Sequence, residues 1–172
     1  HADPISRGHV VSQLGACRSL LDVQETLRAG SLPLTRIRPF VLVVVDPRQT
    51  VATVSWNGHE LTTAPCPLPA FFVSNGGDLA AATHARSETF ERHRSTWASD
   101  GPTDEQIVAL FGSHEPEPGH YSVCMHFPPF ARTRSLTWTR FRANGAIMHH
   151  IAGSPCNETR VLTATLPWGR NA

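Results

Sequence analysis

Residues 40–56 read FVLVVVDPRQTVATVSW, and this stretch decides the fold class. The six apolar residues Phe40–Val45 are mostly β-branched, which predicts a buried strand. Residues 46–49 form a turn signal around Pro47, and the alternation over Val51–Trp56 predicts the partner strand of a hairpin. Hairpins build antiparallel sheets, so the stretch argues against a parallel sheet made of alternating βαβ units.

The sequence on either side of this hairpin separates into helical and strand patterns. Apolar residues at helical spacing predict helices over residues 10–17, 20–27, 79–97 and 103–111. Alternating or continuous apolar runs predict strands over residues 59–62, 71–73, 121–126, 133–142, 146–151 and 159–166. Asn144-Gly145 is a hairpin turn signal between two of these strands. The order of elements predicts an α+β fold with helices segregated from largely antiparallel sheets.

Composition limits the classes of function. A chain of 172 residues predicts a single domain over residues 1–172. The run at 40–45 is far shorter than the roughly 18 apolar residues of a membrane span. The net charge of +1 does not indicate the strongly basic surface that is typical of nucleic-acid-binding proteins. All 15 basic residues are arginine, so a mechanism through a lysine Schiff base is excluded.

The four cysteines, Cys17, Cys66, Cys124 and Cys156, show no C-x-x-C spacing, so a zinc ribbon or thioredoxin motif is not predicted. The apolar context of Cys17 and Cys124 is typical of buried thiols, and two disulfides remain open as an alternative. A reduced, cytoplasmic protein is the default expectation. The sequence opens on His1 rather than Met, which leads us to expect either a fragment or the removal of a preceding segment.

Histidines are numerous enough to raise the question of a metal. The best group along the sequence is His120, His126, His149 and His150. No H-E-x-x-H pair is present, and the adjacent His149 and His150 would point to opposite faces of a strand. We therefore expect no metal and no cofactor. Cys124 and His126 have the i, i+2 spacing of a thiolate and its base, but a position in mid-strand favours a core role for Cys124.

Residues 71–77, FFVSNGG, are the best candidate for catalytic chemistry. A predicted strand ends here in small polar residues, directly before a predicted helix. The amide of Asn75 would supply a neutral N–H donor to an oxyanion, and Ser74 would shape the same corner. The alternative interpretation is a simple turn. The motifs G-x-G-x-x-G and G-x-S-x-G are both absent, so neither a dinucleotide fingerprint nor a nucleophile elbow is predicted.

Several short motifs together resemble one known family. The residues that carry the resemblance are Ser6-Arg7-Gly8, the strand pair over 40–56, FVSNG at 72–76, Arg86 with Phe90, SVCMH at 122–126 and GSPC at 153–156. Their order and spacing resemble the NRDE family, which includes the transport and Golgi organisation protein 2 homologues. The resemblance extends over nearly the whole chain.

This resemblance implies an Ntn-hydrolase-like αββα sandwich, in which two antiparallel sheets lie between helical layers. In such enzymes a Cys, Ser or Thr at the mature N-terminus is the nucleophile, and its own α-amine is the base. The family's N-terminal Cys and its Asn-Arg-Asp-Glu segment are absent here. We therefore expect the chain to be the C-terminal two-thirds of such a domain, without its first strands and its nucleophile.

The implied reaction is hydrolysis of an amide C–N bond in a small-molecule amide or acyl substrate. The resemblance implies Asn75 and Ser74 as catalytic residues, and Arg86 and His126 as substrate contacts. The alternative is a non-catalytic metabolite- or haem-binding or trafficking protein on the same fold, with Met125, His126 or His149 as axial ligands.

Overall fold

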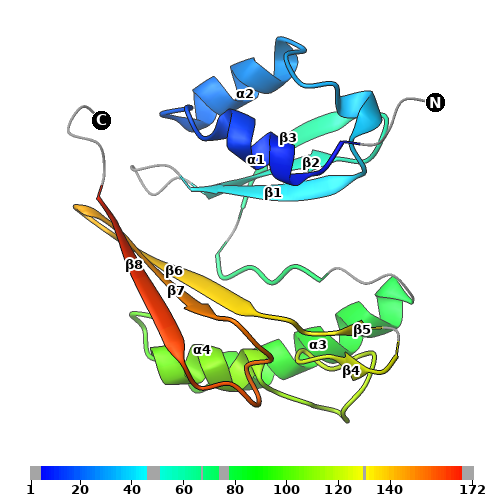
Figure 1. The fold of residues 1–172 in the computed structure, drawn as a ribbon, viewed down its shortest axis with the longest axis vertical. Coiled ribbons are helices and arrows are strands. Elements are labelled where there is room, and N and C mark those ends of the chain that lie inside the picture. The colour runs from blue at the N-terminus through cyan, green and yellow to red at the C-terminus, as the bar shows by residue number, and fades with distance from the viewer. Residues whose placement is uncertain (1–4, 46–50, 67, 74–77, 130, 168–172) are drawn as a thin grey trace. The chain divides into compact units, whose positions relative to one another are not determined.

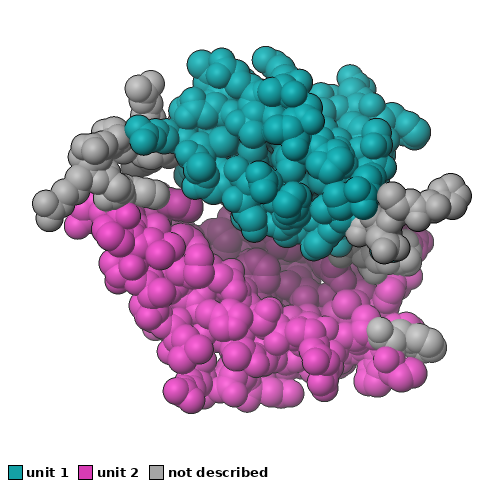
Figure 2. Space-filling model, turned by 45° about the horizontal axis from the view of Figure 1, so that its top comes forward, with its two compact units in different colours: residues 1–70, 168–172 teal, residues 71–167 magenta. Residues whose placement is uncertain are grey.

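The computed structural model describes residues 5–45, 51–66, 68–73, 78–129 and 131–167. The chain divides into two compact units, which are coloured separately in Figure 2. Unit 1 consists of residues 1–70 and 168–172, and unit 2 of residues 71–167. The expectation that the whole chain is one domain stays a prediction.

Unit 1 is an antiparallel sheet covered by helices on one face. Its strands β1 (Phe40–Val45), β2 (Val51–Trp56) and β3 (Leu61–Pro65) lie in the order β1-β2-β3. Helices α1 (Gly8–Leu14) and α2 (Leu20–Arg28) lie over this sheet in Figure 1, and the short 3₁₀ helix η1 (Leu34–Arg36) follows them. The core of the unit gathers apolar side chains from the helices, the sheet and the segment between them: Val10, Leu14, Val23, Leu27, Leu32, Ile37 and Val54.

The hairpin predicted from residues 40–56 is confirmed. Strands β1 and β2 pair in register from Phe40 opposite Trp56 to Val45 opposite Val51. Every second residue of β2 is buried, as alternation requires of a sheet with one covered face. The indole Nε1–H of Trp56 donates to the carbonyl of Ile37 (3.1 Å), which satisfies the polar atom of a buried ring. The predicted turn at 46–49 lies outside the described residues.

Unit 2 contains helices α3 (Leu79–Arg94) and α4 (Asp104–Phe111) and two antiparallel sheets. Strands β4 (His126–Phe127) and β5 (Ala131–Arg132) form the smaller sheet. Strands β6 (Leu136–Arg142), β7 (Gly145–Ile151) and β8 (Val161–Pro167) form the larger one, in the order β6-β7-β8. Helix α4 lies against the larger sheet in Figure 1, and a core of Leu136, Trp138 and Ile151 packs on Ile107, Val108 and Phe111.

The predicted starts of α2, α3 and α4 are confirmed to within one residue, and each of these helices has a side-chain cap. Ser19, Asp78 and Thr103 each accept a backbone N–H from the first turn of α2, α3 and α4, respectively. In α4 the cap is reciprocal, because the side chain of Gln106 also accepts the N–H of Thr103 (2.9 Å). These bonds satisfy donors that no residue earlier in the helix can pair.

Two predicted strands are wrong. Residues 121–126 form an irregular loop except at His126, because the guanidinium of Arg86 takes the carbonyls that a strand would pair. Residues 71–73 are not a strand either; Phe71 stacks on Phe90 of α3 with ring centroids 4.7 Å apart. In both segments a tertiary contact outweighs the local β propensity.

The fold class is therefore mixed α+β. The described residues contain four α-helices and three antiparallel sheets, as the hairpin signals predict. No helix among the described residues combines the length and the apolar character that crossing a membrane requires.

Candidate functional site

Ser74 and Asn75, the predicted oxyanion corner, lie outside the described residues. The residues on either side of them are described. Phe71 is held against Phe90, and Asp78 caps α3 through a hydrogen bond from the N–H of Ala81 (3.0 Å). The described residues that precede and follow positions 74–77, Phe71 and Asp78, thus both contact α3.

Arg86 lies two turns into α3, and its side chain is buried, with 9% exposed. Its Nε–H donates to the carbonyls of Ser122 (3.1 Å) and Tyr121 (3.3 Å), and Nη2 donates to the carbonyl of His120 (3.1 Å). Burial lowers the pKa of the guanidinium from its usual value. These contacts indicate that Arg86 positions the loop before β4; the substrate contact that the resemblance implies for it stays a prediction.

The loop that Arg86 holds is fixed by further hydrogen bonds of its own. The hydroxyl of Ser122, which is fully buried, donates to the carbonyl of Cys124 (2.7 Å) and accepts the N–H of Gly119 (3.4 Å). The N–H of Cys124 donates to the carbonyl of Ser113 (2.9 Å), which joins the loop to the segment that follows α4. As a result, Cys124 occupies a defined position without belonging to a strand.

Four potential metal-ligating side chains meet at the end of this loop. His114 follows α4, Cys124 and His126 flank the start of β4, and Cys156 lies in the turn after β7. Their ligand atoms all lie within 4.8 Å of one another. His126 Nε2 is 3.2 Å from Cys156 Sγ and 3.6 Å from Cys124 Sγ, and its ring meets that of His114 edge to face at 4.9 Å.

The environment of Cys124 disfavours a thiolate when no metal is bound. The side chain is completely buried, and this burial, together with the neighbouring Cys156 thiol, raises the pKa of Cys124 to about 11. A thiol with this pKa is protonated at neutral pH and is a poor nucleophile. The thiolate–imidazole pair considered from the spacing of Cys124 and His126 therefore gains no support from the structure.

The histidine group suggested by the sequence does not come together. Nδ1 of His150 is 2.8 Å from the hydroxyl of Thr137, and the ring of His120 packs near that of Phe127 with centroids 5.1 Å apart. His149 stacks on Trp138 in the larger sheet. Of the four histidines, His126 alone lies in the cluster of four ligating side chains.

Sequence reasoning missed His114 and Cys156. Cys156 is 30 residues from His126, and His114 comes from the segment after a helix, so no local spacing connects them. The sequence signal for this cluster is weak. It consists of a Cys-x-His step at residues 124–126, with His114 before it and Cys156 after it.

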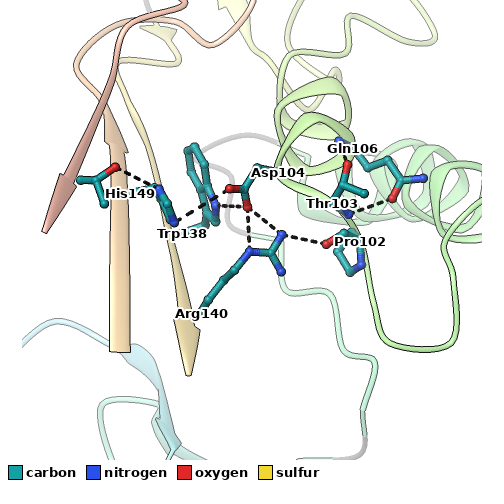
Figure 3. Close-up of polar contacts among 8 residues, drawn as sticks. Pro102, Thr103, Asp104, Gln106, Trp138, Arg140 and His149 are labelled. Atoms are coloured by element: carbon teal, nitrogen blue, oxygen red, sulfur yellow. Dashed lines mark hydrogen bonds and ion pairs between the residues drawn. The ribbon is translucent and has the colours of Figure 1, made fainter. Parts of the chain in front are cut away.

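A second polar group lies at the N-terminus of α4, where Trp138, Arg140 and His149 point toward Asp104 (Figure 3). Asp104 Oδ1 accepts hydrogen bonds from Trp138 Nε1 (3.0 Å) and Arg140 Nε (2.7 Å), and Oδ2 is 3.9 Å from His149 Nε2. Burial opposes ionisation of this carboxyl, but these hydrogen bonds and the nearby positive charge outweigh it, and the pKa of Asp104 is lowered. The carboxylate ties α4 to β6.

An open cleft of about 610 Å³ lies beside this group. Its lining combines apolar side chains with carboxylates and includes Asp104, Val108, Trp138, Ile151, Glu158 and Val161. This volume and this mixture of apolar and polar groups suit a small organic molecule.

Comparison of the chain with known protein families, with curated proteins and with solved structures finds no match. The resemblance to the NRDE family therefore stays an expectation from the residues.

Proposed function

We propose that the chain is part of an Ntn-type hydrolase that cleaves an amide C–N bond of a small molecule. The motifs that resemble the NRDE family support this proposal, and so does the α+β architecture with its antiparallel sheets. In the αββα sandwich of an Ntn-type hydrolase, helices cover one face of each sheet.

The observation that carries the proposal is that, among the described residues, each three-stranded sheet has exposed apolar side chains on the face opposite its helices. In unit 1, Phe40, Leu42 and Val44 pack toward the helices, which leaves Val41 (56% exposed) and Val43 (43%) on the other face. In unit 2, Met148 (37%) and Leu162 (47%) lie on the face opposite the α4 core. Exposed apolar side chains gathered on one face of a sheet are typical of surfaces that another layer of protein covers.

In the proposed reaction the nucleophile at the mature N-terminus attacks the amide carbonyl, and its α-amine transfers the proton to the departing amine. Water then hydrolyses the acyl-enzyme, which releases the acid and restores the nucleophile. Asn75 donates its side-chain N–H to the oxyanion, and Ser74 shapes the corner. Arg86 acts as a positioning residue for the loop before β4. His126 is given no part in the reaction, since both close partners of its Nε2 atom are thiols.

The test uses protein made from the complete coding sequence and a panel of small amide substrates. Replacing Asn75 by Ala is expected to lower kcat by about 10²–10³-fold, the usual effect of removing one oxyanion donor. Asn144→Ala, at an exposed hairpin turn, is the matched control and is expected to leave kcat unchanged. Full activity in Asn75→Ala, or no hydrolysis of any substrate by the unaltered protein, would contradict the proposal.

A second candidate function is non-catalytic binding of a small metabolite, favoured by the cleft beside Asp104 and Trp138. Both ring nitrogens of His149, one of the axial ligands considered for haem, lie near other groups: Nδ1 is 3.2 Å from the hydroxyl of Thr163 and Nε2 is 3.9 Å from Asp104 Oδ2. Haem binding stays a prediction. The check is a thermal-shift screen of small organic molecules on the intact protein and on Val108→Trp, which would fill the cleft. Shifts that persist in Val108→Trp would argue against this function.

A further inference from the structure

We propose that His114, Cys124, His126 and Cys156 bind one Zn²⁺ ion in a tetrahedral Cys₂His₂ site. The site joins three segments of unit 2 that are remote in sequence: the end of α4, the start of β4 and the turn between β7 and β8. The inference is independent of the proposed hydrolysis, because none of the four residues has a part in that reaction.

The distances between the ligand atoms suit zinc. Zinc–sulfur bonds of about 2.3 Å and zinc–nitrogen bonds of about 2.0–2.1 Å place the donor atoms of a tetrahedral site roughly 3.3–3.8 Å apart. The separations of His126 Nε2 from the two sulfur atoms, 3.2 and 3.6 Å, lie at or close to this range. All four ligand atoms lie within 4.8 Å of one another, so small rotations of the side chains close the site around an ion.

The burial of the cluster also points to a ligand. Nε2 of His114 is buried and has no hydrogen-bond partner among the described residues. Cys124 is fully buried beside a second thiol and an imidazole. Buried polar atoms in folded proteins are normally paired, and a bound cation is one way to satisfy an imidazole nitrogen that protein groups leave unpaired.

Bonds outside the cluster hold the ligand segments in place. Arg86 and Ser122 shape the loop that carries Cys124, as described above. The hydroxyl of Ser154 donates to the carbonyl of Thr133 (2.6 Å), and the hydroxyl of Thr133 accepts the N–H of Met125 (2.9 Å). Thr133 thus links the segment of Cys156 to the segment of His126. Such outer partners fix the geometry of metal ligands in proteins.

The ligand types identify the ion and its role. Thiolate and imidazole favour Zn²⁺ over Mg²⁺ or Ca²⁺, which prefer oxygen ligands, and a set of two Cys and two His is a known structural zinc set. Four protein ligands complete a tetrahedron and leave no position for a water molecule, so the ion would fasten the loops rather than catalyse a reaction. On binding, both thiols lose their protons to solvent, and no atom changes oxidation state.

The first measurement is the metal content of the intact, untagged chain after gel filtration in metal-free buffer. We expect about one zinc per chain by elemental analysis, the stoichiometry of a single structural site. Exchange with Co²⁺ is expected to give the visible bands of tetrahedral cobalt and a near-ultraviolet sulfur-to-cobalt band. Removal of zinc by a strong chelator is expected to lower the melting temperature by on the order of 10 °C.

Two ligand variants and two matched controls locate the site. Cys156→Ser and His114→Gln keep the size of the side chain and are expected to lose the zinc and the tetrahedral cobalt spectrum. Cys17→Ser and His150→Gln change the same residue types at hydrogen-bonded positions outside the cluster. These two variants are expected to keep the zinc and the tetrahedral cobalt spectrum. Circular dichroism of each variant separates loss of metal from loss of fold. Cys124 is left unaltered because it is fully buried.

Three outcomes would overturn the inference. One is unaltered protein, prepared with zinc present, that retains no stoichiometric metal and melts at the same temperature with and without chelator. Another is equal zinc content in the ligand variants and the controls. The third is a disulfide between Cys124 and Cys156 found by mass spectrometry of protein purified under reducing conditions. The cobalt spectrum of the unaltered protein needs no variant, so the inference stays testable if the ligand variants fail to fold.

Discussion

Arg86 shows how one side chain changes the backbone of a distant segment. Its guanidinium donates hydrogen bonds to three successive backbone carbonyls, those of residues 120–122. A strand over this segment would need the same carbonyls for a neighbouring strand. The hydrogen bonds from Arg86 replace that pairing and bring Cys124 and His126 to the end of a loop.

Replacing Arg86 by Met therefore removes hydrogen bonds to buried carbonyls while keeping much of the volume. We expect the free energy of unfolding to fall by about 2–4 kcal/mol, because each unsatisfied buried group is costly. Arg92→Met on the same helix is the control. Arg92 Nη1 is 3.2 Å from Glu115 Oε2, and this ion pair is exposed, so it contributes about 0–1 kcal/mol to the free energy of unfolding. Urea unfolding of both variants measures the difference. Equal stabilities would refute the structural role of Arg86.

Asp104 is a residue whose charge state makes stability depend on pH. Its pKa is lowered below 3.8 in the folded chain, so the unfolded chain binds more protons as the pH falls. The stabilisation is complete above the unfolded pKa and is lost as the pH falls through the folded value. The groups that face this carboxyl are Arg140, His149 and the indole of Trp138.

Asp104→Asn is expected to weaken the dependence of unfolding free energy on pH below about pH 4, the range in which a normal aspartate titrates. The side chain is 40% exposed, so solvent screening limits the effect to about 1 kcal/mol or less. Unfolding in urea at several acidic pH values tests this, with Asp100→Asn as the matched substitution. A steeper loss of stability on acidification in Asp104→Asn than in the unaltered chain would contradict the prediction.

At the scale of elements, close backbone contact determines how β7 meets β8. A Cβ atom on Gly145, the first residue of β7, would lie 2.5 Å from the carbonyl oxygen of Leu166 and 3.0 Å from Cα of Pro167. Both are backbone atoms of the paired strand and cannot rotate away as a side chain could. The pairing of β7 with β8 therefore needs a glycine at this position.

Gly145→Ala is expected to lower the free energy of unfolding by about 1–3 kcal/mol, the usual cost of forcing extra atoms into a packed site. Gly119→Ala is the control: a Cβ there meets nothing within 4 Å, and we expect a change within about 0.5 kcal/mol. Amide hydrogen exchange in β8 distinguishes a local loss of pairing from a global effect. Unchanged protection of residues 161–167 together with unchanged stability would contradict the argument.

At the scale of the whole molecule, each unit builds a core from its own residues. The core of unit 1 uses residues 10–54, and that of unit 2 uses residues 107–151. The proposed zinc site lies within unit 2 as well, and it would join segments outside the apolar core of residues 107–151.

Residues 71–167, produced alone in buffer that contains zinc, are accordingly expected to unfold in one cooperative transition. The physical reason is that the core residues Leu136, Trp138 and Ile151 are covered by α4, which the fragment contains. Tryptophan fluorescence and far-ultraviolet circular dichroism should give coincident transitions. Non-coincident transitions would show that the fragment needs the rest of the chain.

The sequence by itself determined the elements whose signals are local. The hairpin over residues 40–56, the helices that begin after Ser19, Asp78 and Thr103, and the turn at Asn144-Gly145 all appear where predicted. Periodic apolar residues, caps and turns act between neighbours in the chain, so a single sequence is enough to find them. The α+β class follows from the same signals.

Only the tertiary structure decided the grouping of His114, Cys124, His126 and Cys156 and the loss of the strand predicted over residues 121–126. Both depend on contacts between segments that are remote in the chain, and above all on Arg86, which is more than 30 residues from the carbonyls it binds. The spacing of residues along a sequence carries no information about how loops converge. Convergence is set by the packing of helices on sheets and by buried hydrogen bonds, which exist only once the chain is folded.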